Sequence, residues 1–325
     1  MTISSDQERF LYKIAQAYYQ QRQTQQEIAR RYAISRPTVS RLLQKARDTG
    51  IVHITLVPPD NGYTDMERAL EEYFHLEEML IVPVQATASA AHIADALGPI
   101  AAGCLLRSMT GNEVVGFAWG RTIRSMVDSL PGRTWPGVTI VQMTGGLGQV
   151  ETAEHSTELT RRVADKFHAQ LRLLPAPGIV TSKAVANALC REPQIRSTLD
   201  LASRADIAVV GLGVPTEDSI VMRYGPLLSE IDLQSLKAAG AVGDIALRYI
   251  CATGEAVTGE INQRIVGLTL AQIRAINRVI GIAGGAGKYD VIRAALRGGI
   301  LDVLVTDHLT AARLYREEVD YAQKS

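Results

Sequence analysis

Three stretches near the N-terminus place their apolar residues on one face of a helix. The apolar positions are Leu11, Ile14, Ala15 and Tyr18 in the first stretch, Ile28, Ala29 and Tyr32 in the second, and Val39, Leu42, Leu43 and Ala46 in the third. Spacings of three and four residues are those of an amphipathic helix. Three such helices can bury one small core between them, so the pattern predicts an all-α unit.

Capping signals define the ends of the second and third helices. Thr24 followed by Glu27 is a capping box, in which each side chain binds the other's free backbone amide. Ser35 is a good N-cap, and Pro37 lies in the first turn, where a missing amide proton costs nothing. Gly50 suits the left-handed end of the third helix. We therefore expect a helix-turn-helix that places its second helix in the major groove of DNA; a solvated helical hairpin is the alternative.

The polar face of the third helix carries the candidate base contacts. Arg41 and Gln44 lie opposite its apolar stripe, and these residue types pair bidentately with guanine and adenine, respectively. Arginines around this helix are placed to contact phosphates and set the register, namely Arg30, Arg31, Arg36 and Arg47. The predicted DNA-binding residues are Thr24, Gln25, Arg30, Arg31, Ser35, Arg36, Pro37, Thr38, Ser40, Arg41, Gln44 and Lys45.

Charge and composition change at a boundary near residue 58. Residues 1–57 hold nine Lys or Arg against four Asp or Glu; because the whole chain is neutral, this segment is +5 and the remainder −5. A basic end of this kind attracts a polyanion. Alternating apolar residues at 52, 54 and 56 predict a short strand, a candidate wing, and Pro58-Pro59-Asp60-Asn61-Gly62 then disfavours regular structure. We expect a DNA-binding domain at 1–57, a linker at 58–65 and an effector-binding and oligomerisation domain at 66–325.

Beyond the linker, short apolar runs alternate with helical stretches. The predicted strands are residues 79–84, 113–118, 138–143, 206–212, 279–283 and 300–305. Continuous apolar runs separated by helices are typical of a parallel sheet covered on both faces, so this part is expected to be an α/β, Rossmann-like domain. The chain has 325 residues, 46% of them hydrophobic, which suffices for two separate cores.

Small or glycine-containing turns follow five of these strands. They are Trp119-Gly120-Arg121-Thr122, Thr144-Gly145-Gly146, Gly211-Leu212-Gly213, Gly284-Gly285-Ala286-Gly287-Lys288 and Thr306-Asp307. Open α/β sheets bind ligands at the carboxyl ends of their strands, and glycines there let backbone amides approach an anion. One such turn is also consistent with plain packing, but five together favour a pocket for a phosphate.

Several enzyme and cofactor classes are disfavoured. Tyr289 stands where a P-loop needs Ser or Thr, and Gly211-Leu212-Gly213 lacks the third glycine of a dinucleotide site. The three cysteines and six histidines show no metal-binding spacing, so no metal or cofactor is expected. No signal segment or apolar run of membrane-spanning length is present, which predicts a cytoplasmic protein without membrane contact. A sugar-phosphate isomerase stays open as the alternative, with the candidate acids and bases Asp206, Asp244, Lys288, Asp307 and His308.

Several of these motifs, in this order, resemble the SorC family of bacterial transcription regulators. At the N-terminus the similar stretches are Leu11-Tyr12-Lys13-Ile14-Ala15, Glu27-Ile28-Ala29, Ser35-Arg36-Pro37-Thr38-Val39-Ser40-Arg41-Leu42-Leu43 and Gly50-Ile51-Val52. In the body they are Trp119-Gly120-Arg121-Thr122, Leu174-Pro175-Ala176-Pro177, Gly240-Ala241-Val242-Gly243-Asp244-Ile245, Ala283-Gly284-Gly285 with Lys288, and Val305-Thr306-Asp307.

The resemblance implies a regulator rather than an enzyme. It implies a sugar-binding domain similar to sugar-phosphate isomerases, a small sugar phosphate or polyol as effector, and a homo-oligomer, commonly a tetramer, on palindromic double-stranded operator DNA. The residues that it implies for the effector are Gly120, Arg121, Thr122, Thr144, Gly145, Gly146, Gly213, Arg223, Asp244, Lys288 and Asp307. The chain departs from the family pattern at Cys251 and His308, where relatives usually carry Asp and Glu.

Overall fold

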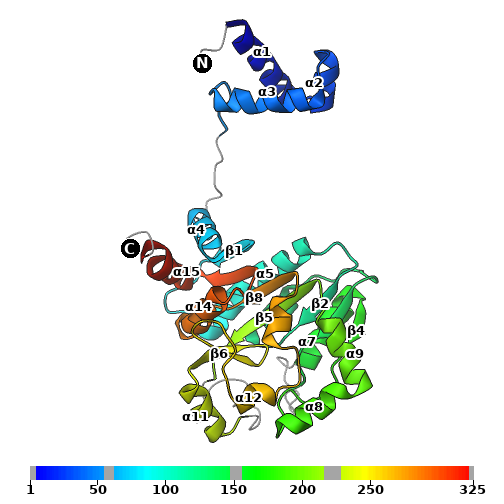
Figure 1. The fold of residues 1–325 in the computed structure, drawn as a ribbon, viewed down its shortest axis with the longest axis vertical. Coiled ribbons are helices and arrows are strands. Elements are labelled where there is room, and N and C mark those ends of the chain that lie inside the picture. The colour runs from blue at the N-terminus through cyan, green and yellow to red at the C-terminus, as the bar shows by residue number, and fades with distance from the viewer. Residues whose placement is uncertain (1–4, 55–61, 147–155, 216–227, 322–325) are drawn as a thin grey trace. The chain divides into compact units, whose positions relative to one another are not determined.

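The computed structural model describes residues 5–54, 62–146, 156–215 and 228–321 (Figure 1). Backbone contacts divide the chain into two compact units, residues 1–60 and 61–325. The predicted linker extended to residue 65, but the first helix of the second unit already begins at Thr64.

The N-terminal unit consists of three helices around a small core. Helix α1 (Ser5–Ala15) continues into a π-helical turn (Gln16–Gln20) and is followed by α2 (Gln25–Arg31) and α3 (Arg36–Asp48). The capping box of Thr24 and Glu27 is present, and the Ser35 hydroxyl accepts a hydrogen bond from the amide of Thr38. Residues 51–54 form no strand, and the rest of the predicted wing lies outside the described residues.

The apolar stripes of these helices meet as the sequence predicts. The core contains Ile14, Ile28, Val39 and Leu43, all at most 3% exposed. Leu11, Ala15 and Ala46 form a second buried cluster where α1 packs on α3. Because the buried positions fall on one face of α3, its other face is exposed to solvent.

The second unit is built on a sheet with seven parallel strands. Their order across the sheet is β1-β9-β8-β5-β2-β3-β4. The strands are β1 (Glu78–Val82), β2 (Val114–Phe117), β3 (Thr139–Gln142), β4 (Gln170–Arg172), β5 (Ile207–Gly213), β8 (Arg278–Ile282) and β9 (Val303–Asp307). Six of them overlap the six predicted strands, and β4 is additional. The predicted fold class, a helical N-terminal unit followed by an α/β domain, is confirmed.

Two antiparallel strands extend this sheet, which the sequence analysis missed. Strand β6 (Ala241–Ile245) pairs with the end of β5, so that Gly213 lies opposite Asp244, and β7 (Arg248–Cys251) pairs with β6. The extension therefore carries Asp244 to the carboxyl end of β5.

Helices connect the strands and cover the sheet. They are α4 (Thr64–Phe74), α5 (Ala90–Ser108), α6 (Arg121–Ser129), α7 (Ser156–Phe167), α8 (Lys183–Arg191), α9 (Pro193–Ala202), α11 (Glu230–Ala238), α12 (Glu260–Gln263), α13 (Leu270–Arg274), α14 (Tyr289–Arg297) and α15 (His308–Leu314), with short turns at Ala286–Lys288 and Tyr315–Val319. Helices α5 and α6 pack closely because Gly98 has no side chain. A Cβ at this position would clash with the backbone of Ser125.

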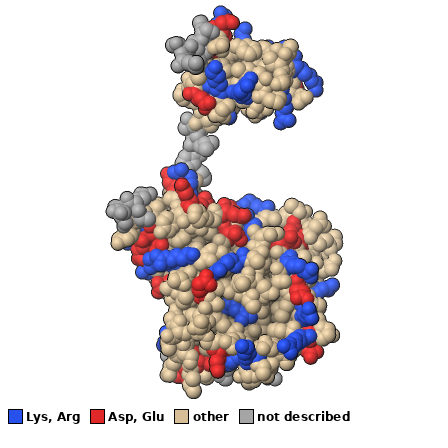
Figure 2. Space-filling model, viewed as in Figure 1, with Lys and Arg blue, Asp and Glu red and all other residues tan. Residues whose placement is uncertain are grey.

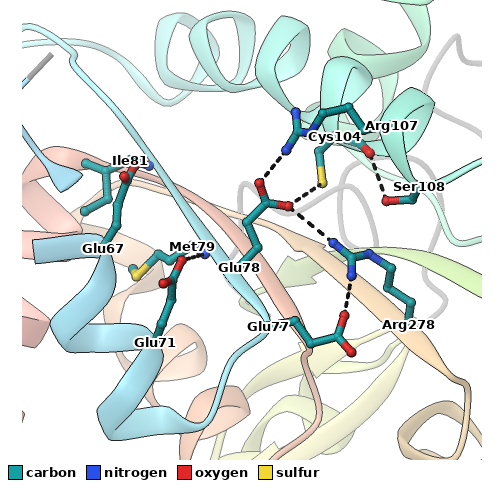
Figure 3. A network of polar contacts seen from close by, with 10 residues as sticks. All are labelled: Glu67, Glu71, Glu77, Glu78, Met79, Ile81, Cys104, Arg107, Ser108 and Arg278. Carbon is teal, nitrogen blue, oxygen red and sulfur yellow. Dashed lines mark hydrogen bonds and ion pairs between the residues drawn. The ribbon is translucent and has the colours of Figure 1, made fainter. Parts of the chain in front are cut away.

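Helix α4 seals the edge of the sheet at β1. The carboxylate of Glu71 accepts a hydrogen bond from the amide of Met79 at 2.7 Å, and that of Glu67 accepts one from Ile81 at 2.9 Å (Figure 3). These amides point away from β9, the neighbour of β1 in the sheet. Burial of the carboxyl group raises the pKa of Glu67. Two carboxylates thus satisfy strand amides that would otherwise be open to another chain.

Candidate functional site

A cavity of about 600 Å³ lies at the carboxyl ends of β2, β5 and β8. Its walls are the first turn of α5, residues 119–122 after β2, residues 211–215 at the end of β5, Asp244 and Ala246 beside β6, and Gly284, Gly287 and Lys288 after β8. The chain runs outward in opposite directions from β2 and β5, to β3 on one side and to β8 on the other. Open α/β sheets bind ligands at such a switch point.

The first turn of α6 lines this cavity and lacks a side-chain cap. Gly120 is the N-cap residue, its φ of +127° suits glycine, and α6 has no side-chain cap. Other helices of this unit, α5 among them, begin with a serine hydroxyl that accepts a backbone amide proton. The α6 amides and the positive end of its dipole are therefore available to an anion. The Thr122 hydroxyl donates to the carbonyl of Ile282 at 3.0 Å, which ties this turn to β8.

Three ionisable side chains line the cavity: Arg121, Asp244 and Lys288. Burial raises the pKa of Asp244 to about 6, although the amide of Leu247 donates to it at 3.0 Å and Lys288 favours its ionised form. Burial lowers the pKa of Lys288 to about 8; Asp244 opposes this shift, and Arg121 adds to it. At neutral pH the cavity therefore holds two cations and one carboxylate, which favours an anionic ligand.

Gly213 leaves room for the carboxylate of Asp244. A side chain at Gly213 would clash with Asp244 Oδ1, because its Cβ would lie much closer than van der Waals contact allows. The antiparallel pairing of β5 and β6 thus places Asp244 directly against the end of β5. A second glycine, Gly284, leaves similar room for Asp307 behind the opposite wall.

Six of the eleven residues predicted for the effector line this cavity. They are Gly120, Arg121, Thr122, Gly213, Asp244 and Lys288. Arg223 lies outside the described residues. The remaining four, which are Thr144, Gly145, Gly146 and Asp307, are not among the cavity's described walls.

Those four residues support the walls from behind. The Thr144 hydroxyl donates to the carbonyl of Ala246 at 3.2 Å, and Gly145 and Gly146 pack against the backbone at Ala176 and Pro177. Thr144–Gly146 follow β3, which lies one strand beyond β2 in the sheet. Asp307 is 1% exposed and uses both carboxylate oxygens for backbone amides and a hydroxyl. That these residues lie along the effector therefore stays a prediction, since the structure places them behind the cavity lining and not in it.

Sequence analysis missed two parts of the wall. The first turn of α5, beginning at the N-cap Ser89, lines the cavity. The signal for it was Ser89 directly before a helical stretch. Trp119, whose turn had been noticed, also lines the cavity, and its indole Nε1 is buried without a hydrogen-bond partner among the described residues. Neither Cys251 nor His308, the two departures from the family pattern, lines the cavity.

The candidate DNA interface is the exposed face of α3. Arg36, Pro37, Ser40, Arg41, Gln44 and Lys45 are exposed there, and Arg30, Arg31, Thr24 and Ser35 are exposed on or beside α2, with Gln25 and Thr38 half-buried. Figure 2 shows Lys and Arg side chains distributed over this unit. Thr24 and Ser35 serve as helix caps. A shallow hollow beside α2 is lined by Arg36 and by one further arginine, Arg22.

The predicted base reader Gln44 is engaged within the helix. Its amide donates to Asp48 at 2.8 Å and accepts from Arg47 at 2.6 Å, and Arg47 also donates to the Tyr19 hydroxyl at 3.2 Å. Contact with adenine would require Gln44 to exchange these partners. The exposed Arg41, by contrast, makes no side-chain hydrogen bond to any of the described residues, so it is the stronger candidate for base contact.

Among the described residues, no helix is both long and apolar enough to cross a membrane. The same residues contain no cluster of His, Cys, Asp and Glu that could hold a metal ion.

Most of the chain is similar to known proteins. Residues 59–316 match the family model Sugar-bind, described as "Putative sugar-binding domain". The chain is 33% identical over 310 residues to the "Uncharacterized transcriptional regulator YjhU" of Escherichia coli strain K12, covering 94% of this chain and 93% of the relative. It is 31% identical over 303 residues to the deoxyribonucleoside regulator of Bacillus subtilis, covering 93% and 96%. The crystal structure of the full-length sorbitol operon regulator SorC from Klebsiella pneumoniae is similar with a TM-score of 0.71 and 32% identity, covering 95% of this chain and 99% of that one.

Proposed function

Because this chain belongs to the SorC family of bacterial transcription regulators, we propose that a small phosphorylated sugar in the cavity controls its binding to operator DNA. In this proposal residues 1–57 bind DNA, residues 58–65 connect, and residues 66–325 bind the effector and form the oligomer. Like its named relatives, the chain is a regulator rather than an enzyme.

The main support for a phosphorylated ligand is the first turn of α6, which has no side-chain cap and lies beside two cations. Gly120 leaves the amides of this turn without a side-chain acceptor, and Arg121 and Lys288 line the same cavity. A phosphate group accepts several charge-assisted hydrogen bonds at once, which a neutral polyol cannot. A volume of about 600 Å³ also lies within the range for small-molecule sites.

Two further residues that line the cavity suit the sugar part of the ligand. Asp244 offers carboxylate oxygens that accept hydrogen bonds from hydroxyls, and the Trp119 ring offers an apolar face. We therefore place the phosphate at α6 with Arg121 and Lys288, and the hydroxyls near Asp244. The names of two relatives, a sorbitol operon regulator and a deoxyribonucleoside regulator, suggest hexitol and pentose phosphates as first probes.

The geometry disfavours the isomerase alternative. Of its five candidate acids and bases, Asp244 and Lys288 line the cavity, whereas Asp206 accepts the amide of Val114 at the amino end of the sheet. Asp307 and His308 are held in backbone hydrogen bonds. An isomerase needs a base that removes a proton from carbon and an acid beside the neighbouring carbonyl oxygen, and three of the five candidates for these roles lie outside the described cavity lining.

The DNA-bound state in this proposal is a homo-oligomer, a tetramer, on a palindromic operator in the cytoplasm, where the bacterial chromosome lies. The effector alters the affinity for the operator, and thermodynamic linkage requires that the operator alter the affinity for the effector by the same factor.

The proposal is tested by fluorescence anisotropy with DNA from upstream of the protein's own gene. The probes are sorbitol 6-phosphate, fructose 6-phosphate and 2-deoxyribose 5-phosphate, each paired with its unphosphorylated counterpart. We expect specific, salt-sensitive DNA binding that a phosphorylated probe changes and its counterpart does not. A response to the free sugars alone would replace phosphosugar by polyol, and chemical conversion of a probe on long incubation would favour the enzyme.

A further inference from the structure

We propose that Asp307 and His308, at the junction of β9 and α15, transmit occupancy of the cavity to the first turn of α4, with Tyr63 as the receiving residue. This inference rests on the proposed function and names the regulatory connection of the same site. It assigns Asp307, His308 and Tyr63 positioning roles, because none of the three lines the cavity.

At the cavity end, Asp307 holds the turn that precedes Lys288. Its Oδ2 accepts the amide proton of Gly285 at 2.6 Å and the hydroxyl proton of Thr310 at 2.7 Å. Its Oδ1 accepts from the amides of Leu309 and Thr310, at 3.1 and 2.9 Å, and so caps α15. One buried carboxylate is therefore shared between the wall of the cavity and the start of α15. A ligand that repositions the Gly284–Lys288 turn must act on this carboxylate.

At the other end, the His308 ring contacts Tyr63. The Nδ1 atom of His308 accepts a hydrogen bond from the amide of Val84 at 3.2 Å, which fixes the ring. The centroids of the His308 and Tyr63 rings lie 5.7 Å apart with an interplanar angle of 40°. Tyr63 is the N-cap residue of α4, and its carbonyl accepts the hydrogen bond from Glu67 that begins the helix, at 2.8 Å.

The rest of α4 is fixed to the sheet, which confines a displacement to its first turn. Glu67 and Glu71 hold the helix to the amides of β1, as Figure 3 shows. Before Tyr63 the chain runs on to the DNA-binding unit. A change at the β9–α15 junction therefore reaches α4 at the point where the connection to residues 1–60 is made.

Three variants and the unaltered protein test this connection. The measured quantity is the ratio of operator dissociation constants with and without the phosphorylated probe that acts on the unaltered protein. Typical coupling corresponds to a ratio of roughly 5 to 150. We expect Tyr63→Ala and His308→Ala each to reduce this ratio by about threefold or more, while the affinity for the probe without DNA stays unchanged. The double variant should lose no more than either single variant, because both interrupt one contact.

Tyr73→Ala is the matched control. It removes a second tyrosine from the same helix, 40% exposed and in ring contact with Phe74, but remote in sequence from the first turn. Its ratio should equal that of the unaltered protein. Hydrogen exchange of residues 62–70 provides a second readout: addition of the probe should change protection there in the unaltered protein and in Tyr73→Ala, but not in Tyr63→Ala.

The outcomes separate this inference from the proposed function. If no probe changes operator binding by the unaltered protein, the proposed function fails, and this inference fails with it. If the probe acts equally on the unaltered protein and on both junction variants, the proposed function stands and the transmission role is overturned. An equal loss in Tyr73→Ala would also overturn it, because the effect would then belong to the whole helix.

Discussion

Replacing Lys288 by methionine should separate the charge of the cavity from its shape. The two side chains have similar length, so the cavity keeps its walls while one of its two cations is lost. A hydrogen bond to a charged group contributes about 1.5–3 kcal/mol, and the affinity for a sugar phosphate at pH 7 should fall roughly 10- to 150-fold.

The lowered pKa of Lys288 adds a signature in pH. With a pKa of about 8, the ammonium group is mostly charged at pH 7 and mostly neutral at pH 9. Binding of an anion favours the charged form, so affinity should weaken by about tenfold between pH 7 and pH 9 as the free protein loses this proton. The Asp244 carboxyl, with its pKa of about 6, and the phosphate ester, with its second ionisation near pH 6, both lose their protons mainly below pH 7. Neither titration therefore accounts for a change between pH 7 and pH 9.

Stability should not account for the loss of affinity. A lysine whose pKa is lowered by burial destabilises the folded state while it is charged, and the penalty is present below pH 8 and relieved as pH rises from about 8 toward the unfolded value. Removing the charge at pH 7 should therefore leave the variant at least as resistant to thermal unfolding as the unaltered protein.

Isothermal titration calorimetry at pH 7, 8 and 9 tests this reasoning, with sorbitol 6-phosphate and 2-deoxyribose 5-phosphate as ligands. Lys237→Met, which removes an exposed lysine from the last turn of α11, is the control and should behave like the unaltered protein. An unchanged affinity in Lys288→Met, or the same tenfold pH dependence in that variant, would refute the role of Lys288 as the phosphate's cation.

Three other predictions concern the cavity and the DNA interface. Gly213→Ala should weaken sugar phosphate binding and cost about 1–3 kcal/mol of stability in thermal unfolding, because its methyl group displaces the Asp244 carboxylate; a neutral result would contradict that close packing. Arg41→Ala should reduce discrimination between operator and scrambled DNA by about 1–3 kcal/mol in anisotropy, with calorimetric affinity for the sugar phosphate unchanged; loss of both would end the division of labour between the units. Operator affinity should fall steeply with salt, with a log–log slope of about −0.9 for each phosphate contacted, and a flat plot would exclude an electrostatic interface.

The helix-turn-helix was predictable because its signals are local. The capping box of Thr24 and Glu27 and the cap at Ser35 involve partners three residues apart, and both are found in the structure. Strands β6 and β7 had no such signal. Asp244 and Arg248 interrupt their apolar pattern, and Arg248 is buried only because its guanidinium donates to carbonyls distant in sequence, such as that of Leu268 at 2.6 Å.

Only part of the candidate site could be predicted, because the ends of strands can be recognised in the sequence but the order of the strands in the sheet cannot. Arg121 and Lys288 follow strands β2 and β8, and both line the cavity. Thr144 follows a strand with the same kind of turn, yet β3 lies on the far side of β2, and the turn packs behind the wall. Asp307 ends a strand too, but its carboxylate is consumed by backbone amides. The sequence shows which residues follow strands, and only the sheet order shows which of them meet.

The carboxylate seal on β1 bears on how the second unit can be prepared alone. A fragment that begins at Glu78 would lack Glu67 and Glu71, and the amides of Met79 and Ile81 would lie open along a strand edge. Unpaired edges of this kind recruit strands from neighbouring molecules, so such a fragment should aggregate on concentration. A fragment that begins at Gly62 keeps the whole of α4 and should remain monodisperse enough for ligand titrations. The place at which the gene is cut thus decides whether the isolated unit can be studied at all.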